Sequence, residues 1–116
     1  LSDSLLNYKE GKKILIFLST HCEYCKLTAE KITISAKNSS NYNNIYFYFA
    51  EEKNEIESFY INNNSYNFSY NILPVEELIS VTKGLFPTIV FTENGKVLHK
   101  SGYRSLTDKD INSFFK

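Results

Sequence analysis

Residues 13–25 decide the fold, and they read KILIFLSTHCEYC. An apolar run over 13–18 stops at Ser-Thr-His, and two cysteines follow with two residues between them. A helix-like pattern begins at once and continues to about residue 37, with Ala29, Ile32 and Ala36 on one face. Cys22 and Cys25 are the only cysteines of the chain. A strand, a Cys-x-x-Cys motif and a helix in this order predict a thiol-disulfide redox site.

The start of a helix suits this chemistry for geometric and electrostatic reasons. Residues three apart lie on neighbouring parts of one helix face, so Cys22 at the mouth and Cys25 one turn further in are close enough to bridge. Unpaired N–H groups and the positive end of the helix dipole favour a thiolate, the species that attacks disulfides. We therefore predict that Cys22 is the exposed nucleophile and Cys25 the resolving cysteine. Glu23 between them suits the dipole but opposes a neighbouring thiolate.

The composition is that of one globular domain, residues 1–116, with an aromatic and β-branched core. Phe and Tyr contribute nine residues each, and Trp and Met are absent. Thirteen basic and thirteen acidic residues cancel, so nothing favours nucleic acid or an anionic membrane as a partner. No apolar run approaches the roughly 20 residues that span a bilayer. Because the chain begins at Leu1, we expect a mature product or an excised piece, and a membrane tether outside it stays open.

Apolar periodicity and turn signals predict the remaining elements. Strands are expected at 13–18, 45–50, 66–72, 86–92 and 97–101, and helices at 22–37, 51–61, from Pro74, and from Ser105 or Thr107 to 115. Glu93-Asn94-Gly95-Lys96 is a strong hairpin turn. Strands that alternate with helices and close with a hairpin and a helix predict an α/β fold, with a mixed central sheet covered on both faces.

Individual side chains follow from the same patterns. Ser19 or Thr20 is expected to cap the first helix. The side chains expected to pack on or beside buried faces include Leu5, Leu6 and Tyr8 of a lead-in over 1–11, Leu27, Ile34, Ile56, Phe59, Tyr60, Tyr66, Phe68, Tyr70, Ile72, Val75, Leu78 and Ile79.

Taken together, these features resemble the thioredoxin superfamily and, within it, the TlpA/ResA-like thiol-disulfide oxidoreductases. The resemblance runs from about Lys12 to Lys116 and rests on four features in order: the strand leading into Cys22-Glu23-Tyr24-Cys25, the long stretch from Cys25 to Pro87, Phe86-Pro87-Thr88, and the Asn94-Gly95 hairpin with Gly102 after it. It implies a thioredoxin-like fold with an extra helix-strand insertion over about 51–73.

The resemblance also implies a function. Pro87 should follow a cis peptide bond and lie beside the cysteines, with the Phe86 backbone offered to an extended substrate peptide. Independently of the resemblance, His21 and Tyr24 are candidate substrate contacts, and Tyr24 is alternatively a partly buried residue of the helix. The activity would be reduction or exchange of disulfides in protein substrates, with a thiol redox donor protein as second partner and no cofactor. We expect the protein to be a monomer. We expect it to work outside the cytoplasm, in the periplasm or tethered to a membrane, with a cytoplasmic location as the alternative.

The chain departs from the family pattern in two places. The family usually has Trp immediately before the first cysteine, where this chain has His21. Thioredoxins bury an Asp in the preceding strand to aid proton transfer, and its counterpart here is about Ile16. Glu30 would substitute for it if its side chain turned inward.

Other interpretations of the same residues remain open. Protonated His21 would stabilise a Cys22 thiolate, or it is simply an exposed loop residue. A copper(I) or zinc site of a metal chaperone would use His21, Cys22 and Cys25, with His99 as a fourth ligand. The known copper chaperones of thioredoxin-like fold space their cysteines by three residues, which this chain does not. A non-catalytic binding module is the third alternative, against which the intact cysteine pair argues.

Overall fold

The protein is built on a five-stranded sheet in the order β3-β2-β1-β4-β5. A computed structural model describes residues 8–106 and 108–115. The strands are β1 (Lys12–Phe17), β2 (Ile45–Phe49), β3 (Ser69–Ile72), β4 (Thr88–Glu93) and β5 (Lys96–Ser101). β2 pairs parallel with both β1 and β3, whereas β4 is antiparallel to both β1 and β5. The predicted mixed sheet is confirmed.

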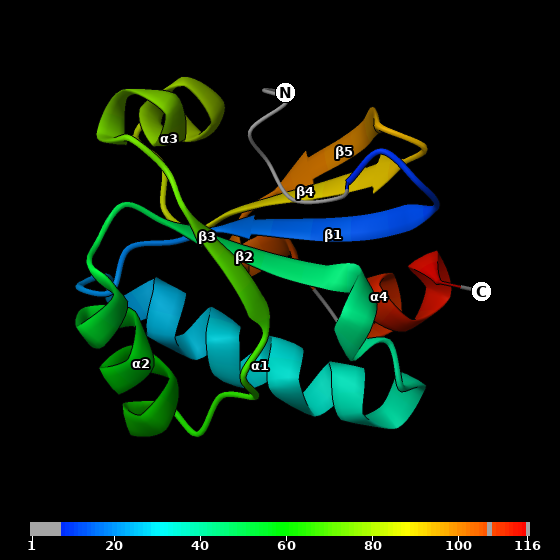
Figure 1. Ribbon diagram of the computed structural model, residues 1–116. Coiled ribbons are helices and arrows are strands. Elements are labelled where there is room, and N and C mark those ends of the chain that lie inside the picture. Colours follow the sequence, from blue (N-terminus) through cyan, green and yellow to red (C-terminus); the bar gives the residue numbers. More distant parts are fainter. Residues whose placement is uncertain (1–7, 107, 116) are drawn as a thin grey trace.

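Helices cover both faces of this sheet, as predicted (Figure 1). They are α1 (Glu23–Ser39), α2 (Lys53–Asn62), α3 (Val75–Thr82) and α4 (Asp108–Phe114), with short 3-10 turns at Tyr42–Asn44 and Tyr103–Ser105. Figure 1 shows α1, α2 and α4 on one side of the sheet and α3 on the other. The helix and strand expected within 51–73 are α2 and β3; that they are an insertion stays a prediction.

The central strand β1 explains why its apolar residues follow one another without a break. Ile14 and Ile16 pack in the core on one side of the sheet, and Leu15 and Phe17 pack in the core on the other. Because both faces of this strand are covered, none of its side chains needs to face solvent. Polar residues therefore do not alternate with apolar ones along it. Tyr8 of the lead-in is buried in the second of these cores, whereas Leu5 and Leu6 lie outside the described residues.

An aromatic cluster fills the space between β2 and α2. The Phe47 ring stacks on Phe68 at a centroid distance of 4.7 Å and meets the edge of Tyr60 at 5.7 Å. Phe49 meets the edge of Phe59 at 5.5 Å. Offset stacks and edge contacts of this kind stabilise the fold by more than the burial of their apolar surface alone. The prediction that Ile56, Phe59 and Tyr60 face inward is confirmed.

Several apolar side chains predicted on or beside buried faces are instead exposed: Leu27, Ile34, Tyr66, Ile72, Val75 and Ile79. α1 and α3 each bury a single stripe, and α3 buries only Leu78 of its three predicted inward residues. β3 begins at Ser69 rather than Tyr66, because the Tyr66 N–H donates to Thr33 Oγ1 at 3.0 Å and not to β2. Pro74 precedes α3 as its N-cap instead of opening it.

The predicted hairpin at residues 93–96 is confirmed between β4 and β5. Asn94 and Gly95 both adopt positive φ, 51° and 85°, the backbone conformation of a two-residue hairpin turn. Asn94 also exchanges two 2.9 Å hydrogen bonds with the backbone of Gly11, which joins the lead-in to the hairpin. Of the two caps proposed for the last helix, Ser105 belongs to the preceding 3-10 turn and Thr107 lies outside the described residues.

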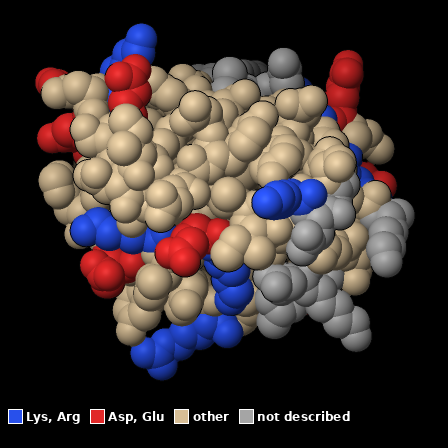
Figure 2. All heavy atoms as spheres, turned by 90° about the horizontal axis from the view of Figure 1, so that it is seen from below, with Lys and Arg blue, Asp and Glu red and all other residues tan. Residues whose placement is uncertain are grey.

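Figure 2 views the molecule from the side of α1, α2 and α4, where acidic and basic side chains are interspersed. In the described part of the chain, every helix is too short or too polar to cross a membrane.

Candidate active site

The cysteine motif lies at the start of α1, beyond the end of β1. Cys22 is the N-cap, and its Sγ accepts the N–H of Cys25 at 3.3 Å. The predicted caps, Ser19 and Thr20, are wrong because the helix begins at Glu23, too far along the chain for either to serve. As the cap atom, this sulfur satisfies one of the N–H groups that the first turn of the helix leaves without an intrahelical partner.

The two cysteines differ in their access to solvent. Both are free thiols, with Cys22 half-buried and Cys25 fully buried. Cys22 Sγ lies 3.6 Å from the Phe86 carbonyl oxygen, to which its thiol donates. Cys25 Sγ accepts the Ser19 N–H at 3.5 Å. At the start of α1, the thiol of Cys22 is therefore accessible to solvent, whereas the neighbouring thiol of Cys25 is buried.

The buried position strongly affects the proton of Cys25. Burial raises the pKa of the Cys25 thiol well above its ordinary value, and its hydrogen bond with Cys22 acts in the same direction. The negative charge of Glu51 raises this pKa further, whereas the Ser19 N–H lowers it. Cys25 is therefore a protonated thiol at neutral pH and needs a base before it can act as a nucleophile.

Glu51 is a residue of this site that the sequence analysis missed. The Ser19 hydroxyl donates to its Oε2 at 2.9 Å, while its Oε1 is buried and has no hydrogen-bond partner among the described residues. The sequence analysis placed Glu51 only in the first turn of a helix. The available signal was topological: β1 and β2 are parallel, so the residues that follow each strand meet at the same edge of the sheet.

The two carboxylate positions considered from the sequence do not serve the cysteines. Ile16 is fully buried among apolar side chains at the position where thioredoxins would carry Asp. Glu30 is exposed on α1 and does not turn inward. Glu51 is therefore the acidic side chain that acts on Cys25.

A groove lies beside the cysteines on the side of Pro87. The Phe86–Pro87 peptide bond is cis, as the resemblance implied, and Pro87 is buried. The groove has a volume of about 350 Å³, and its lining consists of Tyr24, residues 85–87 and residues 102–105. Three of the four predicted substrate contacts, Tyr24, Phe86 and Pro87, thus line one surface next to Cys22.

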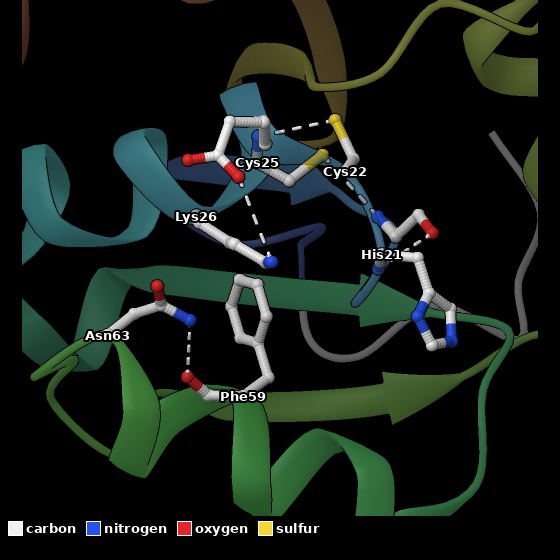
Figure 3. Close-up of polar contacts among 8 residues, drawn as sticks. His21, Cys22, Cys25, Lys26, Phe59 and Asn63 are labelled. Carbon is white, nitrogen blue, oxygen red and sulfur yellow. Dashed lines mark hydrogen bonds and ion pairs between the residues drawn. The ribbon is translucent and has the colours of Figure 1, made fainter.

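His21 belongs to a different surface. Its imidazole is exposed and points away from both sulfur atoms (Figure 3). It lines a second hollow of about 440 Å³ together with Lys26, Phe59 and Asn63, among others. The alternative in which His21 stabilises the Cys22 thiolate gains no support from this orientation.

The metal alternative also gains no support. Among residues 8–106 and 108–115, no three His, Cys, Asp or Glu side chains are grouped so that they could hold a metal ion. His99, the proposed fourth ligand, lies on β5 with its ring 5.8 Å from the ring of Phe91.

Comparisons with known proteins identify the fold. No family model and no curated protein matches the chain. Among solved structures, StoA from Bacillus subtilis is 16% identical, with 95% of this chain and 86% of that chain covered and a TM-score of 0.68. The thioredoxin domain of a thiol-disulfide oxidoreductase from Bacteroides vulgatus is 17% identical, with coverage of 90% and 76% and a TM-score of 0.68.

This chain has a thioredoxin fold. A secreted Mycobacterium tuberculosis disulfide oxidoreductase, homologous to Escherichia coli DsbE, shares it at 14% identity, coverage of 90% and 80%, and a TM-score of 0.64. The predicted thioredoxin fold is thus confirmed, and at this level of identity the likeness concerns the fold. Within this thioredoxin fold, the cysteine motif and the Pro87 groove lie side by side.

Proposed function

We propose that this protein is a thiol-disulfide oxidoreductase that reduces or exchanges disulfides in protein substrates through Cys22 and Cys25. The observation that carries the proposal is the pair of free thiols in the first turn of α1, one accessible and one buried directly behind it. Cys22 is the attacking cysteine and Cys25 the resolving cysteine.

The reaction conserves electrons and protons through two exchanges. The Cys22 thiolate attacks one sulfur of the substrate disulfide, the substrate S–S bond breaks, and the departing substrate sulfur takes up a proton. Cys25 then loses its proton and attacks Cys22, which forms the Cys22–Cys25 disulfide and releases the second substrate thiol. The protein has given two electrons and the proton of Cys25, while the other proton of the substrate dithiol comes from solvent. A thiol redox donor protein then restores the reduced cysteine pair. Run backwards, the same steps oxidise a substrate dithiol.

Glu51 is the base for the second exchange. Its charge acts on Cys25, its Oε2 is held by the hydroxyl of Ser19, and its Oε1 is buried without a partner among the described residues and so is free to accept a proton. The backbone N–H of the same Ser19 contacts the Cys25 sulfur. Glu51 thus replaces, from the end of β2, the carboxylate that is missing at Ile16.

The substrate lies across the groove beside Cys22. Phe86 and Pro87 offer backbone to an extended peptide, and Tyr24 provides an exposed aromatic surface. We place the activity in an extracytoplasmic compartment, either periplasmic or tethered to a membrane by a segment outside this chain. The description of the M. tuberculosis protein as secreted supports this placement. The active unit is a monomer of one domain that uses no cofactor.

The first test is the reduction potential of the Cys22–Cys25 pair, measured by equilibration in glutathione or dithiothreitol buffers. We expect a value between about −120 and −270 mV, the range of exchange catalysts. The more negative end indicates a reductase and the less negative end an oxidant or isomerase. A value below about −300 mV is that of a structural disulfide and would refute the proposal.

The same titration, repeated from pH 5 to pH 10, tests the buried thiol. Because the pKa of Cys25 is raised above its ordinary value, the reduced protein keeps this proton throughout the range. At least one proton then accompanies each electron pair, so the potential should fall by at least about 30 mV for each pH unit. A potential that became independent of pH below pH 10 would contradict the raised pKa.

Replacement of Glu51 by Gln tests whether Glu51 acts as a base or only through its negative charge. The two roles predict opposite changes in the rate of the second exchange. Loss of the charge alone lowers the pKa of Cys25 and would speed the second exchange. Loss of the base slows it, and we expect the mixed disulfide to persist about a hundredfold longer at pH 7. Quenched-flow trapping of the mixed disulfide measures its lifetime. Glu52→Gln is the matched control, since Glu52 is exposed and makes no capping hydrogen bond to α2.

A further inference from the structure

The groove beside Pro87 carries one charged side chain. Its lining is aromatic, aliphatic or neutral at every position except Arg104. Leu85, with 71% of its surface exposed, and the half-exposed ring of Tyr24 give the groove an apolar character. A single cation on an apolar surface is a feature that selects among ligands of different charge.

The guanidinium of Arg104 is held in place by Tyr24, whose ring packs against a second tyrosine. It donates to the hydroxyl of Tyr24 at 3.3 Å and lies 5.8 Å from the centroid of the same ring. The Tyr24 ring packs in turn against Tyr103 at 5.5 Å. A guanidinium is charged at every relevant pH, and the hydrogen bond with Tyr24 raises the pKa of Arg104 further. A positioned guanidinium loses less freedom when it binds a carboxylate than a mobile lysine does.

The positive charge has no acidic partner in the described part of the chain. Lys26 pairs with Glu23 and Lys53 with Glu57, and neither ion pair includes Arg104. Glu23, the acidic residue of the cysteine motif, is thus drawn toward Lys26. Arg104 has five N–H donors and uses one on Tyr24, which leaves a fork for the two oxygens of a carboxylate.

The position of the groove relative to Cys22 determines what would meet this charge. Phe86 lines the groove and its carbonyl accepts from the Cys22 thiol, so the groove begins at the reactive sulfur. Tyr24 lies two residues after Cys22, and its hydroxyl accepts the hydrogen bond from Arg104. A peptide linked to Cys22 through its own cysteine and extended along this groove would pass Arg104 within a few residues of that cysteine.

We propose that Arg104, held by Tyr24, makes the groove selective for substrate segments with an Asp or Glu a few residues from the reacting cysteine. The inference rests on the proposed function and names its substrate class: an extended, acidic, disulfide-bearing peptide. The apolar residues of this peptide contact Leu85 and Tyr103. Its carboxylate accepts hydrogen bonds from the guanidinium N–H groups of Arg104 that are not bonded to Tyr24. The charge pair is exposed, so its contribution is moderate and falls as salt is added.

The test uses three disulfide-linked peptides that differ only in having Glu, Gln or Lys two residues from the cysteine. For the wild-type protein at low salt, we expect kcat/KM to be about fivefold higher with Glu than with Lys, and the ratio to approach one at 0.5 M NaCl. Arg104→Gln should remove most of the preference, and Arg104→Glu should reverse it. Lys37→Glu makes the same change in net charge near the C-terminal end of α1, and should leave the preference intact.

Two results would overturn the inference, and they are distinguishable. Equal rates with the Glu and Lys peptides, or a preference that survives Arg104→Glu, refute the role of Arg104 while the exchange activity stands. Failure of the wild-type protein to exchange any peptide or hydroxyethyl disulfide, a neutral probe of the cysteines alone, refutes the proposed function and this selectivity with it. Circular dichroism of each variant shows whether the fold is retained.

Discussion

Replacement of Cys22 by Ser is expected to abolish disulfide exchange, and replacement of Cys25 by Ser is expected to leave the protein covalently attached to its substrate. Serine is not ionised near neutral pH and does not attack a disulfide, so the rate with Cys22→Ser should fall by at least about a thousandfold. Cys25→Ser keeps the accessible thiol at the start of α1 and still forms the mixed disulfide. Without Cys25, no sulfur stands behind Cys22 to release the substrate.

Non-reducing gel electrophoresis after incubation with a disulfide-bearing protein measures both outcomes. The adduct of Cys25→Ser should disappear on addition of dithiothreitol, and the Cys22→Ser lane should show none. The double variant is the control for non-specific attachment. Adducts of equal amount in both single variants would mean that the roles are not divided between the two cysteines. Wild-type turnover in either variant would show that the motif is not the active site.

Replacement of Phe47 by Ala is expected to lower the free energy of unfolding by about 3–5 kcal/mol. Phe47 is fully buried in β2 and contacts the rings of Phe68, Tyr60 and Phe49. Its truncation removes buried area and leaves a cavity between the sheet and α2. Domains of this kind have a total stability of about 5–15 kcal/mol, so the loss is a large fraction of it.

Urea unfolding of the reduced protein, followed by circular dichroism, measures this loss. Phe47→Leu keeps most of the volume and should cost less than about 1.5 kcal/mol, which gives a measurable value even if the alanine variant does not fold. Ile61→Ala is the surface control, because 76% of Ile61 is exposed on α2, and it should change stability by less than about 0.5 kcal/mol. Equal effects at Phe47 and Ile61 would show that the aromatic cluster does not stabilise the fold.

Local signals in the sequence were sufficient for the backbone of the fold. The unbroken apolar run at 13–18 predicted β1, and Asn94-Gly95 predicted the hairpin, because each depends on the preferences of a few consecutive residues. Interactions that need a distant partner were predicted less well. Tyr66 and Ile72 alternate with polar residues as in a half-buried strand. Tyr66, however, precedes β3 and stacks on Tyr42 with its side chain half exposed, and Ile72 is exposed at the end of β3, the edge strand of the sheet.

In the cysteine motif too, some features were predictable from the sequence and others depend on the tertiary structure. Its spacing and its place before a helix placed an accessible Cys22 in front of a buried Cys25 from sequence alone. Which atom caps the helix was not predictable, because Ser19 and Thr20 are better caps than a sulfur by preference, and only the start of α1 at Glu23 gives Cys22 that place. Ser19 contacts Glu51 instead, across the parallel pair of β1 and β2.

The sequence by itself determined the order of strands and helices and the cysteine pair, since these depend on periodicity and short motifs. The place of Pro87 beside the cysteines was implied by the family resemblance. Only the tertiary structure brought the charge of Glu51 to bear on Cys25 and placed Arg104 against the Tyr24 hydroxyl in the groove. Glu51 follows Cys25 by 26 positions and Arg104 follows Tyr24 by 80, and no local preference encodes such a distance. The folded sheet brings these charges to the cysteines because the ends of its strands and the start of α1 meet at one edge.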